Sequence, residues 1–62
     1  MPEVRVLIAD DQQLLRQSLA HLLDSQPGFR VVAEAATGVD AVSLTRELVP
    51  DVVLMDIRMP QL

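Results

Sequence analysis

The chain has 62 residues, half of them apolar, with a net charge of −4 and no cysteine. This composition excludes a disordered chain and a disulfide-stapled fold, and its singly spaced arginines exclude a clustered basic surface for nucleic acid. No apolar stretch is long enough to cross a membrane, and the lack of cysteine fits the cytoplasm, where we expect the protein to work.

The first two expected elements are a buried strand and an amphipathic helix. Val4–Ala9 is an apolar run rich in β-branched residues, which is typical of a strand covered on both faces. Leu14–Asp24 has the residue spacing of a helix with one apolar stripe. We expect the stripe to consist of Leu15, Leu19, Leu22 and Leu23, with Arg16, Gln17, His21 and Asp24 on the opposite, polar arc.

Two further strands are expected later in the chain. Phe29–Ala35 interrupts its apolar residues with Arg30 and Glu34, which indicates a strand at the edge of a sheet. Asp51–Asp56 contains the apolar run "VVLM" and is expected to be the third strand. Each strand lies between segments of helical pattern or turn residues, so we expect a sheet covered by helices.

A second helix is expected between these two strands. Thr37 and Gly38 predict a loop, and Asp40 lies near the expected helix start. Pro50 ends the helix, because proline has no N–H to donate and restricts the residue before it. We expect its inward face to consist of Ala41, Val42, Leu48 and Val49.

The order βαβαβ predicts an α/β fold with a parallel sheet. Right-handed crossovers that leave the first strand in opposite directions give the order 2-1-3, with one helix on each face. Ligands bind at the carboxyl ends of strands where the order reverses, which here is between the first and third strands. Asp10 and Asp11 follow the first strand and Asp56 follows the third, so three carboxylates are expected in one crevice.

Three carboxylates a few ångströms apart repel one another, so either one takes up a proton or a cation lies between them. Oxygen ligands without nearby His or Cys suit Mg²⁺ or Mn²⁺. Such a centre is typical of phosphoryl transfer, in which Asp56 would be the nucleophile. Adjacent aspartates after a strand can equally be turn and N-cap residues, and it is the combination of Asp10, Asp11 and Asp56 that favours chemistry.

Two segments carry a family resemblance. "VLIADDQQLLRQSL" and, further on, "PDVVLMDIRMP" resemble the receiver domain of two-component response regulators, a flavodoxin-like fold. The resemblance is greatest to the subgroup that usually carries a LuxR-type helix-turn-helix domain. It implies phosphoryl transfer from a histidine kinase partner to the receiver, which is a signalling module and not an enzyme. It also implies control of transcription by the full-length protein.

The resemblance assigns roles to individual residues. Asp56 would be the phosphoacceptor, Asp11 would bind Mg²⁺ directly, and Asp10 would act mostly through water. The backbone carbonyl of Arg58 would supply a further ligand, and Pro60 would shape the loop around the metal.

The chain departs from the family pattern because it reaches only three of five strands and contains no lysine to meet the phosphoryl group. We therefore expect residues 1–62 to be the N-terminal half of a receiver, without strands 4 and 5 or helices 3 to 5. A core of this size is marginal alone, and the third strand would expose an apolar edge. We expect a homodimer or larger self-association, and slow or absent phosphorylation of this chain by itself.

Two other functions stay open. One is an association module that carries out no phosphoryl chemistry. The other is a phosphohydrolase resembling haloacid dehalogenases, which is disfavoured because Arg58 stands where that family needs a second acid. No part of the segment is expected to contact nucleic acid or a membrane.

Overall fold

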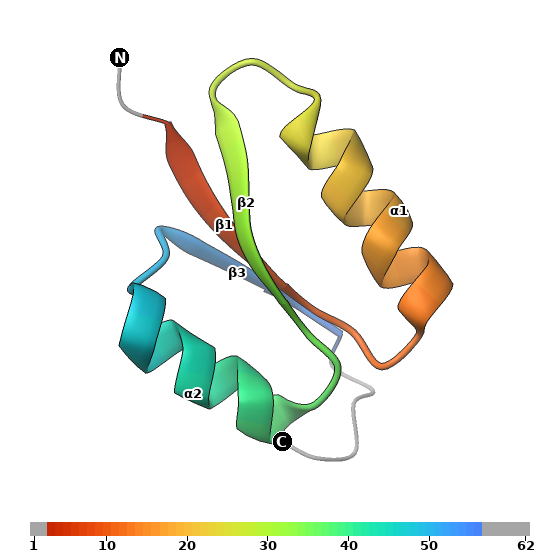
Figure 1. Ribbon diagram of the computed structural model, residues 1–62, viewed down its shortest axis with the longest axis vertical. Coiled ribbons are helices and arrows are strands. Elements are labelled where there is room, and N and C mark those ends of the chain that lie inside the picture. Colours follow the sequence, from red (N-terminus) through yellow and green to blue (C-terminus); the bar gives the residue numbers. More distant parts are fainter. Residues whose placement is uncertain (1–2, 57–62) are drawn as a thin grey trace.

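A computed structural model describes residues 3–56. The elements follow the predicted order βαβαβ, as Figure 1 shows. Their bounds are β1 Val4–Ala9, α1 Gln13–Asp24, β2 Phe29–Ala35, α2 Gly38–Leu48 and β3 Val52–Met55. The first two strands have the predicted bounds, and α1 begins one residue earlier than predicted.

The sheet has the predicted topology. All strand pairs are parallel and the order is β2-β1-β3, so β2 is at an edge as expected. The two helices lie on opposite sides of the sheet, with the strands between them in Figure 1. The order 2-1-3 and the placement of one helix on each face are therefore confirmed.

The core is built around β1, whose alternating side chains face the two helices. Leu7 and Ala9 pack with Ala41 of α2 on one face of the sheet. Val6 and Ile8 form a separate cluster on the face covered by α1. A central parallel strand is covered on both faces, which explains why its sequence is continuously apolar.

Arg5 and Asp51 join the beginning of β1 to the segment before β3. The Arg5 N–H donates to Asp51 Oδ2, and the Asp51 N–H donates to the Arg5 carbonyl, each at 2.8 Å. The Arg5 Nη1 atom also donates to the Val49 carbonyl at 2.9 Å. From this anchored start the two strands run in register until Ala9 pairs with Met55.

The predicted apolar stripe of α1 is partly wrong. Leu15 and Leu22 are 40% and 56% exposed, whereas Ala20 is buried against the sheet. Leu19 and Leu23 do pack against that cluster. The contact face of α1 therefore consists of Leu19, Ala20 and Leu23, and does not include the two exposed leucines.

The predicted position of Arg16 on the polar arc of α1 is also wrong. Its side chain is only 14% exposed, and it lies on the same helical face as Ala20 and Leu23, at the spacing i, i+4 and i+7. A long basic side chain near a helix start can lie along the sheet and still bring its polar end to hydrogen-bond partners.

Helix α2 begins earlier and faces inward differently than predicted. The Thr37 hydroxyl oxygen accepts the Asp40 N–H at 3.1 Å, so Thr37 is the N-cap and Gly38 is helical, not a loop residue. Val42 and Val49, expected inside, are 48% and 69% exposed. Ala41 is buried as predicted, and Leu44, three residues on, packs against the same cluster. Leu48, the fourth residue of the predicted face, is intermediate in burial.

Candidate metal centre

The sheet topology places the three predicted carboxylates at one edge. Asp10 follows β1 directly and Asp56 follows β3 directly, and the last residues of these adjacent strands are paired. The Asp56 N–H donates to the Ala9 carbonyl at 3.0 Å, which continues the ladder by one bond. On the other side of β1, the Asp10 N–H donates to the Ala35 carbonyl at 3.0 Å.

Asp10, Asp11 and Asp56 form a compact acidic group. One carboxylate oxygen from each lies within 4.8 Å of the corresponding oxygens of the other two. Asp10 is buried at 6% exposure, Asp56 is intermediate and Asp11 is exposed. The structure therefore brings together the three residues that the topology argument selected, while their chemical roles stay predictions.

Asp10 is also a turn residue, which is the alternative role considered for adjacent aspartates after a strand. Its Oδ1 accepts the N–H of Gln12 at 2.8 Å, which closes a turn between β1 and α1. Gln12 is the N-cap of α1 and makes no side-chain cap bond of its own. Because this bond orients one oxygen of Asp10, the carboxylate has a defined direction at the edge of the sheet.

The donor set fits a hard divalent cation. Carboxylate oxygens are the ligands that Mg²⁺ takes at about 2.0–2.1 Å, so two of its octahedral ligands lie about 3 Å apart when adjacent and about 4.2 Å apart when opposite. The carboxylate oxygens of the acidic group lie within 4.8 Å of one another, a limit slightly longer than the distance between opposite ligands. The three carboxylates are therefore close enough together to hold one such ion, either directly or through water. The predicted ligand at the Arg58 carbonyl lies outside the described residues.

A hollow of about 360 Å³ adjoins the acidic group, between α1 and the ends of β1 and β3. Its lining combines two of the carboxylates with apolar side chains: Ile8, Ala9, Asp10, Leu19, Leu54, Met55 and Asp56. A mostly apolar wall lowers the local dielectric, which would strengthen the interaction of a bound cation with the carboxylates.

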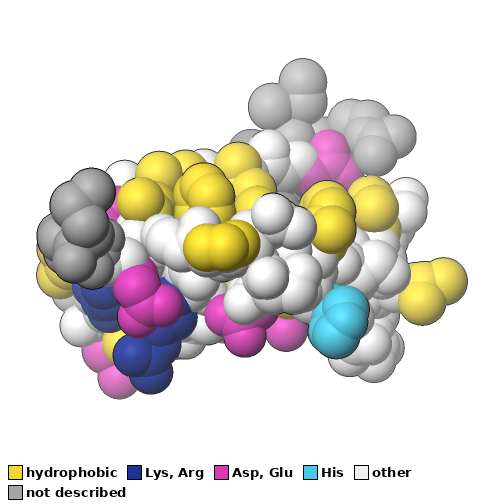
Figure 2. All heavy atoms as spheres, turned by 90° about the horizontal axis from the view of Figure 1, so that it is seen from above, with side chains coloured by type: hydrophobic (Ala, Val, Ile, Leu, Met, Phe, Trp, Pro, Cys, Tyr) yellow, Lys and Arg dark blue, Asp and Glu magenta, His cyan; other side chains and the backbone are white. Residues whose placement is uncertain are grey.

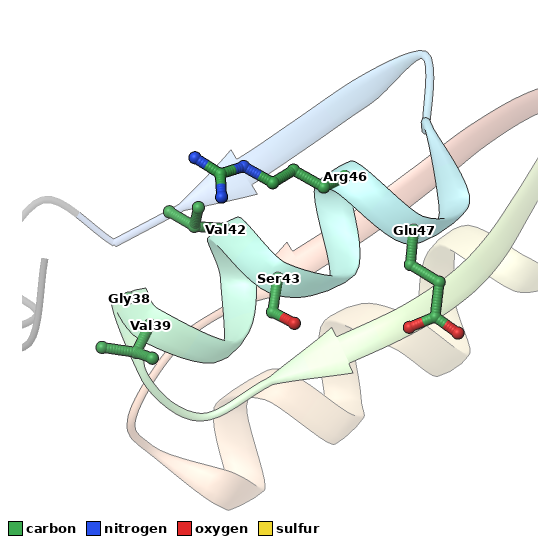
Figure 3. A pocket seen from close by; sticks show the side chains of 6 residues that line it. All are labelled: Gly38, Val39, Val42, Ser43, Arg46 and Glu47. Atoms are coloured by element: carbon green, nitrogen blue, oxygen red, sulfur yellow. The ribbon is translucent and has the colours of Figure 1, made fainter.

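A second hollow, of about 620 Å³, runs along α2 and contains none of the three aspartates. Figure 3 shows that its labelled side chains come from this one helix. The lining residues are Gly38, Val39, Val42, Ser43, Arg46 and Glu47. This surface lacks converging polar groups from different elements, so it is a weaker candidate for a site than the strand ends.

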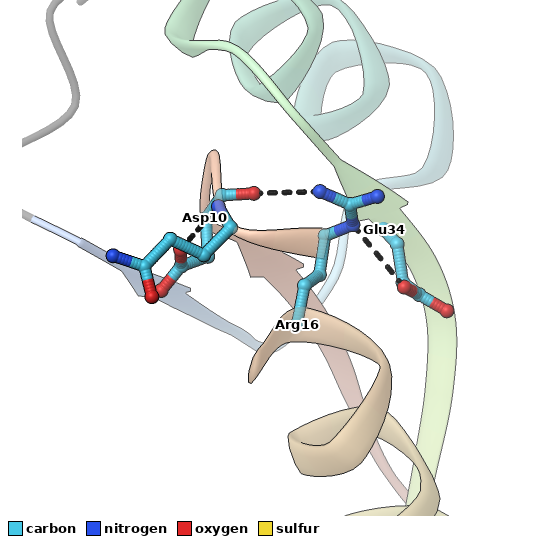
Figure 4. A network of polar contacts seen from close by, with 4 residues as sticks. Asp10, Arg16 and Glu34 are labelled. Atoms are coloured by element: carbon cyan, nitrogen blue, oxygen red, sulfur yellow. Dashed lines mark hydrogen bonds and ion pairs between the residues drawn. The ribbon is translucent and has the colours of Figure 1, made fainter. Parts of the chain in front are cut away.

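Sequence reasoning missed two residues beside the acidic group. Arg16 donates to the Asp10 carbonyl and to Glu34 of β2, as Figure 4 shows. The spacing of Arg16 from Ala20 and Leu23 was the available signal for its inward position, but the leucines of α1 suggested a different face.

Neither helix in the part of the chain that the structure describes is long and apolar enough to span a membrane.

Parallel strands with order 2-1-3, one helix on each face and acids at the switch point define a doubly wound α/β architecture with an acidic group at its carboxyl edge. Residues 6–62 match the family described as the response regulator receiver domain. The chain belongs to this family, as the resemblance of its two motifs implied.

Two curated relatives illustrate the similarity. The chain is 51% identical over 57 residues to a protein-glutamate methylesterase/protein-glutamine glutaminase of Anaeromyxobacter dehalogenans, covering 92% of this chain and 17% of that protein. It is 46% identical over 57 residues to the response regulator GacA of Pseudomonas aeruginosa, covering 92% and 27%. The chain thus spans about a sixth to a quarter of the length of these relatives.

Solved structures show the same fold. The response regulator domain of Thermotoga maritima CheB superposes with a TM-score of 0.91 at 47% identity, covering 97% of this chain and 45% of that one. A LuxR-family two-component response regulator from Aurantimonas sp. SI85-9A1 gives a TM-score of 0.87 at 40% identity, covering 94% and 41%. The predicted receiver topology is confirmed by these superpositions.

Proposed function

We propose that residues 1–62 are the N-terminal part of a receiver module that accepts a phosphoryl group on Asp56. The observation that carries the proposal is the convergence of three carboxylates within 4.8 Å at the switch point of the sheet. Membership of the receiver family supports it, and so does the position of Asp56 at the end of a strand beside the buried Asp10.

In the proposed reaction, a carboxylate oxygen of Asp56 attacks the phosphorus of a phosphohistidine on a kinase. The phosphorus–nitrogen bond breaks, an acyl phosphate forms, and the departing imidazole takes a proton. Asp10 and Asp11 would hold Mg²⁺ together with Asp56 and the Arg58 carbonyl. A bound Mg²⁺ would neutralise charge on the phosphoryl oxygens and on the clustered carboxylates.

For the longer protein we propose control of transcription in response to a histidine kinase. Relatives named as transcriptional regulatory proteins, such as LiaR of Bacillus subtilis at 46% identity, support this output. The methylesterase relatives, at up to 51% identity, make an effector enzyme the competing output. In either case the receiver would act by shifting a conformational equilibrium when Asp56 is modified.

Intact-mass measurement of the longer protein, after incubation with a phosphorylated histidine kinase or acetyl phosphate and Mg²⁺, tests the proposal, because residues 1–62 alone contain no lysine to meet the phosphoryl group. We expect one added phosphoryl group. Chelation of Mg²⁺ before mixing should prevent its addition, and Asp56→Asn should not be labelled. Asp40→Asn is the matched control, because Asp40 is exposed on α2 and outside the acidic group. Labelling that persists in Asp56→Asn, or no labelling of the longer protein after prolonged incubation, would rule the assignment out.

An association module without phosphoryl chemistry is the second candidate. It is favoured by the exposure of β3, where Val52, Val53 and Leu54 are 41%, 37% and 42% exposed. Within residues 3–56, β3 pairs only with β1 and leaves its other edge open. Self-association without any labelling of Asp56 would favour this candidate over the first.

A further inference from the structure

Arg16 connects three elements beside the acidic group. Its Nη1 atom donates to the backbone carbonyl of Asp10 at 2.8 Å, and its Nε atom donates to Glu34 Oε1 at 3.3 Å. Figure 4 shows the guanidinium of α1 lying between the end of β1 and the side chain from β2. One rigid, planar group therefore satisfies two acceptors from two strands.

The first of these contacts falls where the ladder of β1 ends. The Asp10 N–H still bonds to β2 through Ala35, but its carbonyl lies beyond the last paired residue, Ala9. A buried carbonyl without a partner is costly, and the Arg16 Nη1 atom provides one. With the bond from Gln12 to Oδ1, Asp10 is held at its amide, its carbonyl and its carboxylate.

Glu34 orients the guanidinium from the other side. It pairs in register with Ile8 of β1, so its side chain starts one strand away from the acidic group. The Glu34 side chain is 36% exposed and the Arg16 side chain 14%, so their ion pair is partly shielded from water. Its main contribution is therefore the direction of the Arg16 fork, since partly exposed pairs add little stability.

We propose that Arg16, oriented by Glu34, is a positioning residue for the acidic group. By fixing the Asp10 carbonyl, it sets the backbone from which the carboxylates of Asp10 and Asp11 face Asp56. The proposal rests on the proposed function only in taking a divalent cation as the ligand of that group, and it needs no phosphoryl transfer.

Removal of the Arg16 charge separates positioning from simple electrostatics. A positive group beside three carboxylates opposes cation binding, so its loss would tighten binding if charge were its only effect. A positioning role predicts the opposite sign. Residues that orient metal ligands typically change metal affinity by about 10- to 100-fold when removed.

The test measures the Mn²⁺ dissociation constant of the 62-residue chain by electron paramagnetic resonance of free Mn²⁺. Arg16→Met is expected to weaken Mn²⁺ binding by about tenfold. Arg16→Lys keeps the charge but cannot form both bonds, and is expected to weaken binding by about threefold. Glu34→Gln is expected to weaken it by about twofold, through a less directed Arg16. Arg46→Met removes an exposed arginine of α2 as the matched control and should tighten binding slightly or leave it unchanged.

A second measurement, made without metal, distinguishes a local change at Asp10 from unfolding of a variant. Hydrogen exchange of the Gln12 amide, which bonds to Asp10 Oδ1, should accelerate at least about threefold in Arg16→Met while the amides of β1 keep their protection. Unchanged or tighter Mn²⁺ binding in Arg16→Met, or uniform acceleration of all amides, would overturn the proposal. If Asp56 is never phosphorylated but these shifts occur, the proposed function fails and the role of Arg16 stands.

Discussion

At the scale of single residues, the acidic group combines one buried carboxylate with one exposed one. Asp10 is fixed by hydrogen bonds and closes the turn into α1, so its charge cannot be separated from its structural role. Asp11 is exposed and therefore contributes its charge with little effect on packing. Asp11 is thus the residue at which the electrostatic cost of the site can be measured most directly.

Asp11→Asn is expected to raise the free energy of unfolding of the metal-free chain by about 1 kcal/mol, because it relieves repulsion among three clustered carboxylates. It should also reduce the stabilisation gained from added Mg²⁺, since stabilisation by a ligand follows its affinity for the folded state. Thermal unfolding followed by circular dichroism, with and without Mg²⁺, measures both effects.

Asp40→Asn provides the control of opposite sign. Asp40 lies in the first turn of α2, where a negative charge interacts favourably with the helix dipole. Its removal should lower stability by about 0.5 kcal/mol and leave the Mg²⁺ response unchanged. Equal effects of the two substitutions would contradict a special repulsion at the strand ends.

At the scale of elements, the sequence was a better guide to strands than to helix faces. The alternation of strands and helices, with right-handed crossovers, predicted the sheet order, and the acids after β1 and β3 then predicted the convergence of Asp10 with Asp56. Which face of a helix is buried depends on the angle at which the helix crosses the sheet. The spacing of apolar residues in the sequence does not determine this angle. Ala20, which the predicted stripe of α1 did not include, is buried in the contact of that helix beside Leu19 and Leu23.

The inward position of Arg16 could not be predicted for the same reason. A basic residue in an amphipathic helix is normally placed in solvent, and only the close approach of α1 to the ends of β1 and β2 gives Arg16 two acceptors. The carboxylates could be predicted because topology alone brings strand ends together. Their supporting contacts could not, because these require the three-dimensional placement of a helix.

The end of α2 stores backbone strain that a substitution should release. Val49 has φ of 48° in the left-handed region, which is costly for a β-branched residue, and its side chain is 69% exposed. Val49→Gly is expected to raise the free energy of unfolding by about 0.5–1 kcal/mol, because relief of strain exceeds the added chain entropy. Urea denaturation measures the change.

Val49→Ala is the control for loss of the exposed valine side chain. Alanine keeps the Cβ that disfavours a positive φ, so its stability should stay within about 0.5 kcal/mol of the parent. The carbonyl of residue 49, which accepts from Arg5 Nη1 at 2.9 Å, is present in both variants. A glycine variant no more stable than the alanine variant would show that the left-handed conformation is not strained.

At the scale of the whole molecule, the central strand β1 is the most buried element, whereas the apolar residues of β3 stay partly exposed. Leu7 and Ile8 are almost completely buried, whereas the middle of β3 is about two-fifths exposed. A hollow of about 450 Å³ lies between α2 and this strand, beside Val53 and Met55. Figure 2 shows hydrophobic side chains gathered along one side of the molecule, with most charged side chains on other parts of the view.

An open, apolar edge strand can pair with a second copy of itself. A twofold arrangement is the simplest closed form, and it would bring equivalent residues of two β3 strands close together. Val53→Lys is therefore expected to weaken self-association of the 62-residue chain by at least about tenfold, because two like charges would face each other across the axis. Analytical ultracentrifugation over a range of concentrations measures the dissociation constant.

Val39→Lys is the matched control, because Val39 is 69% exposed and lies on α2, not on β3. It adds the same charge and should leave self-association unchanged. A parent chain that is monomeric at every concentration would show that the β3 edge does not self-pair. If Val39→Lys weakened association as strongly as Val53→Lys, the outer surface of α2 would be the interface instead. A lysine on α2 can oppose association that strongly only if the two copies are in contact at this helix.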